Sequence, residues 1–494
     1  MAFVGRENEL KLFDALWNSD RPEFLFMPGR RRIGKTELVF HWLQTRQPEK
    51  SLYWVAENDS SQSQLSSFSS EIYTLGAGRP LTGQFTFGNW RQAFEEIGRA
   101  AVDQRVVVIL DEFTYLLASD RSAGSALQHA WDGVLKRSNV FLIVTGSHMG
   151  LMSNVINRNG PLYNRPTAEL VLRPLPFSAT NQFFPRKLSI DDRVKYYACF
   201  GGVPGYWDLV RPETSVLENI YQIFVKRKYM ANEAETMLYD FVRESHNYAS
   251  LLRAIANGAR TFKEMEQATG IPNTSVTKYI SVLISARYVI KKTPLTKSPG
   301  RNSRYFVADP ALRFQHRFFQ SRGSQLAKGI SQHVMDDIKA HLPLFIGEHT
   351  WEELCRDWLW LAGSNGLVPM PLEVGSTWSR QAQIDIVGIN PRERKLTLGE
   401  AKWTQSPEPR RTLENLVRKV PLVLPAGKKV WEITLLGMSR SGWKTTAIEY
   451  AKELNGSALA IGKEGNWKLE KLLLRDLSTI DQELENWESL PEIE

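Results

Sequence analysis

Eight consecutive residues near the amino end have the types and the spacing needed to hold a chain of phosphates. They are Gly29-Arg30-Arg31-Arg32-Ile33-Gly34-Lys35-Thr36, and they directly follow a short apolar run. Glycines let backbone N–H groups face phosphate oxygens, Lys35 adds positive charge at the β and γ positions, and Thr36 offers a hydroxyl to Mg²⁺. A helix beginning at Thr36 would direct its positive end at the same anion. The pattern predicts a site for ATP and Mg²⁺; the alternative is a degenerate loop.

Acidic side chains follow a second apolar run, residues 106–110. Asp111 is suited to hold Mg²⁺ through water, and Glu112 is suited to polarise the attacking water. Ser147 follows a third run, where its hydroxyl would sense the γ-phosphate. Acid pairs after strands are common, so this pair indicates ATP hydrolysis only in combination with the phosphate loop. Together they predict hydrolysis of ATP, with Lys35 and Glu112 as catalytic residues.

A second group of chemically suited residues lies in the last third of the chain. Two apolar segments flank a turn and are predicted to pair as a hairpin centred near Arg392. Asp385 then faces Glu400, and Lys402 projects on the same side as Glu400, because side chains two apart share a face. Two carboxylates on an apolar hairpin are costly unless a hard cation such as Mg²⁺ joins them. Asp385 and Glu400 are therefore predicted metal ligands, and Lys402 is predicted to orient or activate water.

The Glu-x-Lys spacing at Glu400 is not informative alone, because it recurs at Glu9 and Glu393. The copy at Glu400 differs in ending an alternating strand. Upstream, residues 350–359 predict an amphipathic helix that would supply another acid to the same site.

The segments that carry the first group alternate between strand and helix patterns. Apolar runs bounded by loop residues predict buried strands, and helical periodicity lies between them. This alternation predicts an α/β fold with a mostly parallel sheet covered on both faces. The expected strands are residues 24–27, 52–55, 106–110, 140–144 and 168–172.

The middle of the chain predicts a helix-turn-helix followed by a two-stranded wing. Thr261 and Glu264 form a capping box at the first short helix. The second helix begins at Asn273, and its apolar positions lie on one face. The opposite, polar face would be available to enter a groove of a nucleic acid. Strands at residues 287–290 and 305–307 flank a basic loop suited to phosphate contacts, and a packing or regulatory role for this segment is the alternative. The cations of the wing are Lys291, Lys292, Lys297, Arg301 and Arg304.

Charge and composition agree with a nucleic-acid partner. The net charge is +8, and residues 253–322 hold 13 Lys or Arg against three acids; a basic surface without a ligand is the alternative. The two cysteines, Cys199 and Cys355, stand far apart and predict neither disulfides nor a thiolate zinc site. No apolar run approaches the ~20 residues that span a bilayer, and the first residues lack a signal pattern, so we expect a cytoplasmic protein without a membrane partner.

The amino-terminal residues resemble the archaeal-type P-loop ATPases of the AAA+ and STAND superfamily. The resemblance rests on Phe3-Val4-Gly5-Arg6-Glu7, on the phosphate loop extended to Leu38, and on two further segments, residues 161–165 and 201–206. It implies a helical lid that contains Pro204, and it makes Arg165 a candidate phosphate contact. An ordinary surface role for Arg165 is as well supported.

The carboxy-terminal residues resemble PD-(D/E)xK nucleases. The resemblance implies that Glu352 is the metal-side acid of the upstream helix, with Glu353 in reserve, and that Asp385, Glu400 and Lys402 complete the site. Ile384 stands where these nucleases usually carry proline, which leaves the chemistry feasible. A nuclease-like domain without activity and a surface salt-bridge cluster are the alternatives.

The expected protein is an ATPase that regulates or drives a Mg²⁺-dependent nuclease-like domain acting on nucleic acid, most simply DNA. One rival is a nucleotide-switched DNA-binding or signalling ATPase that does not cleave. Another is an ATPase subunit that serves a partner protein, and a homo-oligomer is compatible with each. The expected domains are a P-loop core at 1–175, a helical lid at 176–240, a winged helix at 241–322, a linker at 323–345, a restriction-endonuclease-like α/β domain at 346–478 and an acidic tail at 479–494.

Overall fold

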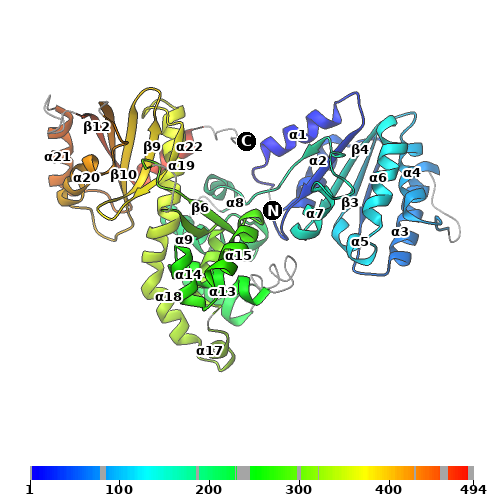
Figure 1. Ribbon diagram of the computed structural model, residues 1–494, viewed down its shortest axis with the longest axis horizontal. Helices are drawn as coiled ribbons and strands as arrows, with labels where there is room; N and C mark the ends of the chain where they lie inside the picture. Colours follow the sequence, from blue (N-terminus) through cyan, green and yellow to red (C-terminus); the bar gives the residue numbers. More distant parts are fainter. Residues whose placement is uncertain are drawn as a thin grey trace. The chain divides into compact units, whose positions relative to one another are not determined.

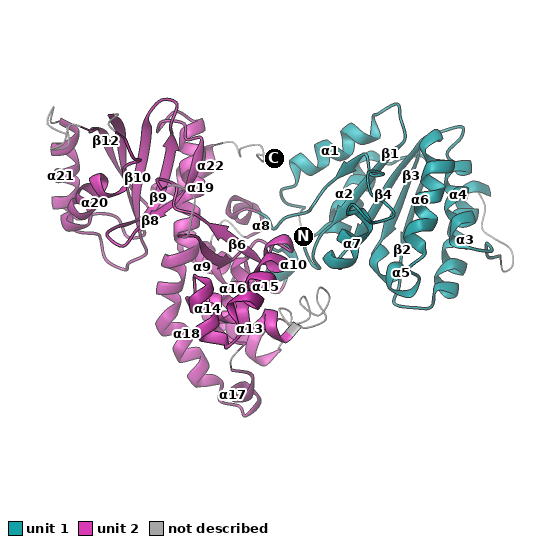
Figure 2. Ribbon diagram, viewed as in Figure 1, with its two compact units in different colours: residues 1–175, 203–208, 235–245 teal, residues 176–202, 209–234, 246–494 magenta. Residues whose placement is uncertain are grey.

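The computed structural model describes residues 3–77, 85–184, 188–227, 230, 245–297, 302–320, 322–427, 430–456 and 466–487 (Figure 1). The chain divides into two compact units, coloured separately in Figure 2. Among the described residues, the first unit contains 3–175 and 203–208, and the second contains the rest apart from 245.

The first unit is built on a parallel five-stranded sheet in the order β2-β3-β4-β1-β5. Every residue of β1, β3 and β4 is buried, as expected for strands covered by helices on both faces. The α/β prediction is thus confirmed, although the fifth strand is only two residues long. The strands are β1 (Glu23–Pro28), β2 (Ser51–Val55), β3 (Val106–Asp111), β4 (Val140–Gly146) and β5 (Ala168–Glu169).

Helices connect these strands and surround the sheet (Figure 1). Apolar side chains of α3 to α6 pack with the strands in one continuous core. The helices of this unit are α1 (Glu7–Trp17), α2 (Lys35–Arg46), α3 (Ser61–Ala77), α4 (Trp90–Ala100), α5 (Phe113–Ser119), α6 (Ala123–Gly133), α7 (Met149–Ile156) and the short α10 (Pro204–Trp207).

The second unit begins with short helices in the region predicted as a lid. They are α8 (Thr180–Phe183), α9 (Ile190–Phe200), α11 (Val216–Ile220) and a π-helical turn, Tyr221–Lys226. Residues 228–229 and 231–240 of the predicted lid lie outside the described part of the chain.

The next segment has the predicted helix-turn-helix and hairpin, preceded by one more helix. The capping box at Thr261 and Glu264 is present, and Val276, Ile280 and Leu283 form the buried face of the second helix. The first wing strand begins two residues later than predicted, because Arg287 adopts a left-handed conformation with φ 61°. The elements are α13 (Ser245–Ala256), α14 (Phe262–Thr269), α15 (Asn273–Ser285), β6 (Val289–Lys292) and β7 (Arg304–Val307).

The segment predicted as a linker, residues 323–345, consists of two helices. After α16 (Pro310–Phe318), it forms α17 (Gly323–Ala327) and α18 (Ser331–Phe345). A π-helical stretch, Ile346–Trp351, then leads directly into α19 (Glu352–Ser364). Val334, Ile338 and Leu342 recur at helical spacing and are buried, so packing against the rest of the unit explains why this segment is ordered as helix.

The last part is a mixed five-stranded sheet in the order β12-β11-β10-β9-β8. Strands β8, β9 and β10 are antiparallel neighbours, whereas β10, β11 and β12 are parallel. Apolar residues of α20 and α21 pack on this sheet. The elements are β8 (Glu373–Trp378), β9 (Gln383–Asn390), β10 (Lys395–Lys402), α20 (Arg410–Val423), β11 (Trp431–Ser439), α21 (Thr445–Gly456), β12 (Trp467–Asp476) and α22 (Leu477–Asn486).

The beginning of the predicted acidic tail is not separate from this unit. It forms most of α22, where Asp481 pairs with Arg193, and Glu483 accepts hydrogen bonds from Arg475 (2.8 Å) and Trp358 (2.8 Å). These partly buried acids therefore pair with cations of the unit. Residues 488–494 lie outside the described part of the chain.

Among the helices of the described residues, none combines the length and the apolar character that crossing a bilayer requires.

Candidate functional site

The phosphate loop joins β1 to α2 in the predicted strand-loop-helix context. Its backbone is left-handed at Arg32 (φ 63°) and Gly34 (φ 95°), which turns the chain so that α2 starts at Lys35. Lys35 is only 5% exposed, and its ammonium donates to the carbonyl oxygens of Gly29 (2.7 Å) and Arg30 (3.2 Å). Burial lowers the pKa of Lys35, against the opposing charges of Glu112 and Asp111.

Asp111 and Thr36, the two residues predicted to hold Mg²⁺, lie next to each other. The Thr36 hydroxyl donates to Asp111 Oδ2 at 3.0 Å. The Tyr53 hydroxyl donates to the same oxygen at 2.5 Å, and Thr145 donates to Oδ1. Asp111 is buried, so these donors compensate its desolvation and fix its carboxylate at the end of β3.

Glu112, the predicted catalytic base, is oriented by the end of the neighbouring strand β4. Its Oε2 accepts from the hydroxyl (2.6 Å) and the N–H (3.1 Å) of Ser147, and from the Thr114 hydroxyl (3.3 Å). The backbone of Glu112 itself adopts the left-handed conformation, with φ 50°. Ser147 was predicted as a γ-phosphate sensor, and its contact with Glu112 is a relationship that sequence reasoning did not anticipate.

Two segments that carry the family resemblance lie against the phosphate loop. Arg6 donates to the carbonyl of Ile33 at 3.1 Å, and it pairs with Glu9 at 2.8 Å. The N–H of Gly205 donates to the carbonyl of Arg32 at 3.2 Å, and a Cβ at Gly205 would stand 2.8 Å from the Cβ of Arg32. Only glycine permits this close approach of the two backbones.

Arg165 is engaged elsewhere. Its guanidinium donates to the carbonyl of Tyr163 at 2.6 Å and pairs with Asp132 of α6 at 3.2 Å. Neither partner belongs to the phosphate loop or to the acid pair, so the structure does not gather Arg165 with the other predicted nucleotide contacts. Its role as a phosphate contact stays a prediction.

In the second unit, the hairpin has the predicted register. Strands β9 and β10 pair from Asn390 with Lys395 through Ile386 with Gly399, which brings Asp385 and Glu400 to the next opposed position. Both carboxylates are buried, at 7% and 4% exposure. The register of two strands joined by a short turn depends on neighbouring residues, which explains why the sequence could predict it.

Lys402 joins the two carboxylates. Its Nζ lies 2.6 Å from Glu400 Oε2 and 3.6 Å from Asp385 Oδ2. The N–H of Ala401 donates to the same Asp385 oxygen at 3.3 Å. Burial, followed by the charge of Glu400, raises the pKa of Asp385, whereas the pKa of Glu400 is lowered because the lysines outweigh its burial.

Sequence reasoning missed Lys419. This residue of α20 donates to Glu400 and to the carbonyl of Gln383 (2.9 Å). It lies at the edge of the apolar face of α20, where a lysine is ordinarily a solvated flank. The residues near Lys419 in the sequence do not indicate this partner, because the pair forms only where α20 packs over the hairpin.

The two consecutive glutamates of α19 take different partners. Glu352 pairs with Arg356 (3.2 Å), and the same guanidinium nitrogen donates to the carbonyl of Asp385 (2.8 Å). Burial, and next the charge of Asp385, raises the pKa of Glu352 to about 7. Glu353 instead pairs with Arg313 (3.0 Å) and Lys292 (3.6 Å).

The described residues contain no group of three or more His, Cys, Asp or Glu side chains arranged to hold a metal ion. Arg356 connects Glu352 to the backbone of Asp385, so the structure does not bring all three predicted acids into one cage. Mg²⁺ commonly keeps several waters and needs only one or two carboxylates. Asp385 and Glu400 fit that requirement, and Glu352 as a metal ligand stays a prediction.

Three of the predicted wing cations have partners within the protein, whereas Lys291 is exposed, and phosphate contact by the wing stays a prediction. Lys292 pairs with Glu353, Lys297 donates to the carbonyl of Leu422 (3.3 Å), and the Arg304 guanidinium lies 4.7 Å from the Trp378 ring centre. Arg301 lies outside the described residues.

Comparison with known proteins gives two family matches. Residues 3–210 match an ATPase domain found predominantly in Archaea, and residues 315–413 match a family of archaeal and bacterial proteins of unknown function.

Individual relatives come from the archaeon Methanocaldococcus jannaschii. The chain is 26% identical over 436 residues to an uncharacterized protein, covering 85% of this chain and 92% of that one. It is 33% identical over 49 residues to an uncharacterized ATP-binding protein, covering 10% of this chain and 83% of that one. Among solved structures, the Walker-type ATPase of Pyrococcus abyssi is 18% identical with a TM-score of 0.48, covering 64% of this chain and 96% of that one.

Proposed function

This chain belongs to the family of P-loop ATPases whose domain occurs predominantly in archaea, and we propose that its ATP hydrolysis controls a carboxy-terminal domain that cleaves nucleic acid. The two halves of the proposal have separate support. The family match and the phosphate-loop geometry support the ATPase. The buried carboxylates and lysines on β9, β10 and α20 support the nuclease.

The roles in the ATPase unit follow from the contacts of each side chain. The loop N–H groups and the start of α2 bind the phosphates, and Lys35 exchanges its carbonyl partners for β- and γ-phosphate oxygens. Thr36 and Asp111 would hold Mg²⁺, which neutralises charge on the transferred phosphoryl group. Glu112, oriented by Ser147, positions the attacking water.

A covalent connection supports control of one unit by the other. Residues 203–208, which include Gly205 at the phosphate loop, count with the ATPase unit, while the flanking residues 176–202 and 209–227 count with the second unit. A change at Arg32 therefore reaches both neighbouring segments through the backbone. We propose that this segment couples nucleotide state to the second unit.

One observation carries the nuclease proposal: the Lys402 ammonium lies within 3.6 Å of two buried carboxylates, Asp385 and Glu400, at the end of an antiparallel hairpin. These two acids and the carbonyl of Ala401 would hold Mg²⁺, which supplies activation of water and charge at the scissile phosphate. Lys402 orients that water, and Lys419 holds Glu400. The helix, three-stranded meander and crossover helix of α19 to α20 agree with the nuclease resemblance.

The test is a plasmid-nicking assay with Mg²⁺ or Mn²⁺, in the presence and absence of ATP. We expect metal-dependent nicking by the wild-type protein and none by Asp385→Ala. Glu393→Ala is the matched control, because Glu393 has the same Glu-x-Lys spacing on the same hairpin but is exposed at the turn. Intact plasmid under every condition, or equal nicking by Asp385→Ala, would overturn cleavage.

A second candidate function is a nucleotide-switched nucleic-acid-binding protein without cleavage. Two lysines, Lys402 and Lys419, pair with Glu400, so this site is neutralised largely by protein charges. A lysine-neutralised site suits a structural role as well as a catalytic one. Binding of a labelled duplex that changes between ATP and ADP, together with an intact plasmid, would favour this function.

A further inference from the structure

Among the described residues of the second unit, some basic side chains have partners inside the protein and others have none. Several wing cations belong to the first group. Lys292 pairs with partly buried Glu353, and Arg304 lies against Trp378 and donates to Gln383 at 3.2 Å. A charge held by such contacts has to leave them before it can meet a phosphate.

The wing backbone is also occupied. The N–H of Leu295 donates to the carbonyl of Ser376 at 3.1 Å, and the hydroxyls of Thr296 and Thr377 are 2.8 Å apart. Leu295 and Thr296, which follow β6, thus lie along β8, the outer strand of the mixed sheet. Contacts of this kind protect a sheet edge and hold these two residues on it, whereas the side chain of the next residue, Lys297, is exposed.

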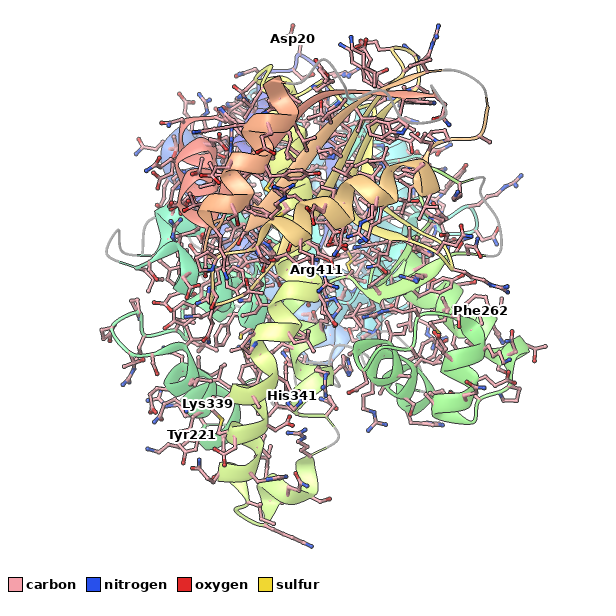
Figure 3. The ribbon with its side chains drawn as sticks, turned by 90° about the vertical axis from the view of Figure 1, so that its left-hand side faces the viewer. Asp20, Tyr221, Phe262, Lys339, His341 and Arg411 are labelled. Carbon is pink, nitrogen blue, oxygen red and sulfur yellow. The ribbon has the colours of Figure 1, made fainter. Side chains whose placement is uncertain are left out.

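Helix α20, in contrast, carries basic side chains of the second group. Arg411, Asn415 and Arg418 recur at helical spacing and are exposed, while Leu413, Leu416 and Val420 form the buried face. Within the described part of the chain, the side chains of Arg411 and Arg418 make no ion pair or hydrogen bond. Figure 3 labels Arg411 on this helix.

The exposed face of α20 continues in two directions. Next to it, Lys419 reaches Glu400 of the hairpin. At the end of the helix, exposed Lys297 of the docked wing donates to the carbonyl of Leu422, where a cation also favours the helix dipole. Arg411 and Arg418 therefore lie on the exposed face of α20, and Lys297 lies at its carboxyl end. Lys419 of the same helix contacts the carboxylate of Glu400.

We propose that this face of α20, extended by Lys297, binds the sugar-phosphate backbone of a nucleic acid and leads it to Asp385 and Glu400. The wing serves as a support that docks the helix-turn-helix segment on the sheet. The identity of the polyanion rests on the proposed function. Arginine and lysine contacts with phosphates position a strand without reading its sequence, so the surface binds without base preference.

The test measures binding of a labelled 30-base-pair duplex by fluorescence anisotropy, in EDTA and over a range of salt concentrations. The variant is Arg411→Gln with Arg418→Gln. The matched control is Arg392→Gln with Arg394→Gln, which removes the same charge from the exposed turn of the hairpin. Both double variants are first checked for the wild-type thermal unfolding midpoint.

We expect the α20 variant to lose about 1.8 from the slope of log binding constant against log salt concentration, because each phosphate contact contributes about 0.9 on duplex DNA. The control variant keeps the wild-type slope. Equal slopes for both variants, or no duplex binding by the wild-type protein, would overturn the proposal.

The result is separable from the nuclease proposal. If plasmid stays intact while only the α20 variant loses slope, the binding surface stands and cleavage fails. If Asp385→Ala abolishes nicking while the two double variants bind alike, cleavage stands and this surface fails. A variant of Lys297 to Gln is expected to lose about 0.9 from the slope, which tests the extension of the surface independently.

Discussion

The hydroxyl of Ser147, at the end of β4, donates to Oε2 of Glu112, at the end of β3, over 2.6 Å. The N–H of Ser147 reaches the same oxygen at 3.1 Å. A serine therefore fixes the carboxylate that is proposed to position water for ATP hydrolysis. Parallel strands bring their carboxyl ends to one edge, which is why residues 35 positions apart meet there.

Replacement of Ser147 by alanine is expected to lower the turnover of ATP by about 10- to 100-fold, because a hydrogen bond to a charged group contributes about 1.5–3 kcal/mol. The KM for ATP should change little, since the phosphate loop is intact. Steady-state kinetics test this. Ser147→Thr keeps a hydroxyl and is expected to restore most of the turnover; equal losses for both variants would contradict an orienting role.

Lys35→Ala is expected to abolish binding of a fluorescent ATP analogue, because the loop loses its positive charge toward the β- and γ-phosphates. Arg165→Ala is the informative comparison. Arg165 pairs with Asp132, and if this pair is its whole role, its removal leaves nucleotide binding unchanged. A loss of binding in Arg165→Ala comparable with that of Lys35→Ala would instead establish Arg165 as a phosphate contact.

Gly205→Ala is expected to impair ATP binding, because the added Cβ would stand 2.8 Å from the Cβ of Arg32 and displace the phosphate loop. Overpacking of this kind typically costs about 1–3 kcal/mol. Gly133→Ala is the control, since a Cβ at Gly133 meets nothing within 4 Å. Titration with ATP compares the two variants, and equal affinities would show that the close approach is not required.

His316 predicts a pH dependence of stability in the second unit. Its ring is fully buried, both ring nitrogens lack a partner among the described residues, and burial followed by the charge of Arg253 lowers its pKa to about 3. The unfolded chain takes up this proton near pH 6.5, whereas the folded protein does not until about pH 3. Stability is therefore complete above pH 6.5 and is lost as the pH falls toward 3.

Urea denaturation at pH 7 and pH 5 measures this effect. His316→Leu removes the proton uptake, so the variant should gain about 2 kcal/mol relative to wild type between pH 7 and pH 5. His333→Gln is the control, because His333 is exposed. A pH dependence unchanged in His316→Leu would show that His316 is not the responsible group.

Features that depend on neighbouring residues were predicted from the sequence. The phosphate loop, the acid pair after β3, the capping box at Thr261 and the register of the β9–β10 hairpin are examples. Each follows from a short repeat, a cap or a turn, and such local rules need no knowledge of distant packing.

Contacts between distant residues were decided by the tertiary structure. Lys419 pairs with Glu400 because α20 packs over the hairpin. The wing contacts β8 through a hydrogen bond from the N–H of Leu295 to the carbonyl of Ser376. Arg356 likewise joins Glu352 to the backbone of Asp385. A sequence determines which side chains are charged and which faces are apolar, whereas the packing of those faces selects the partner of each charge.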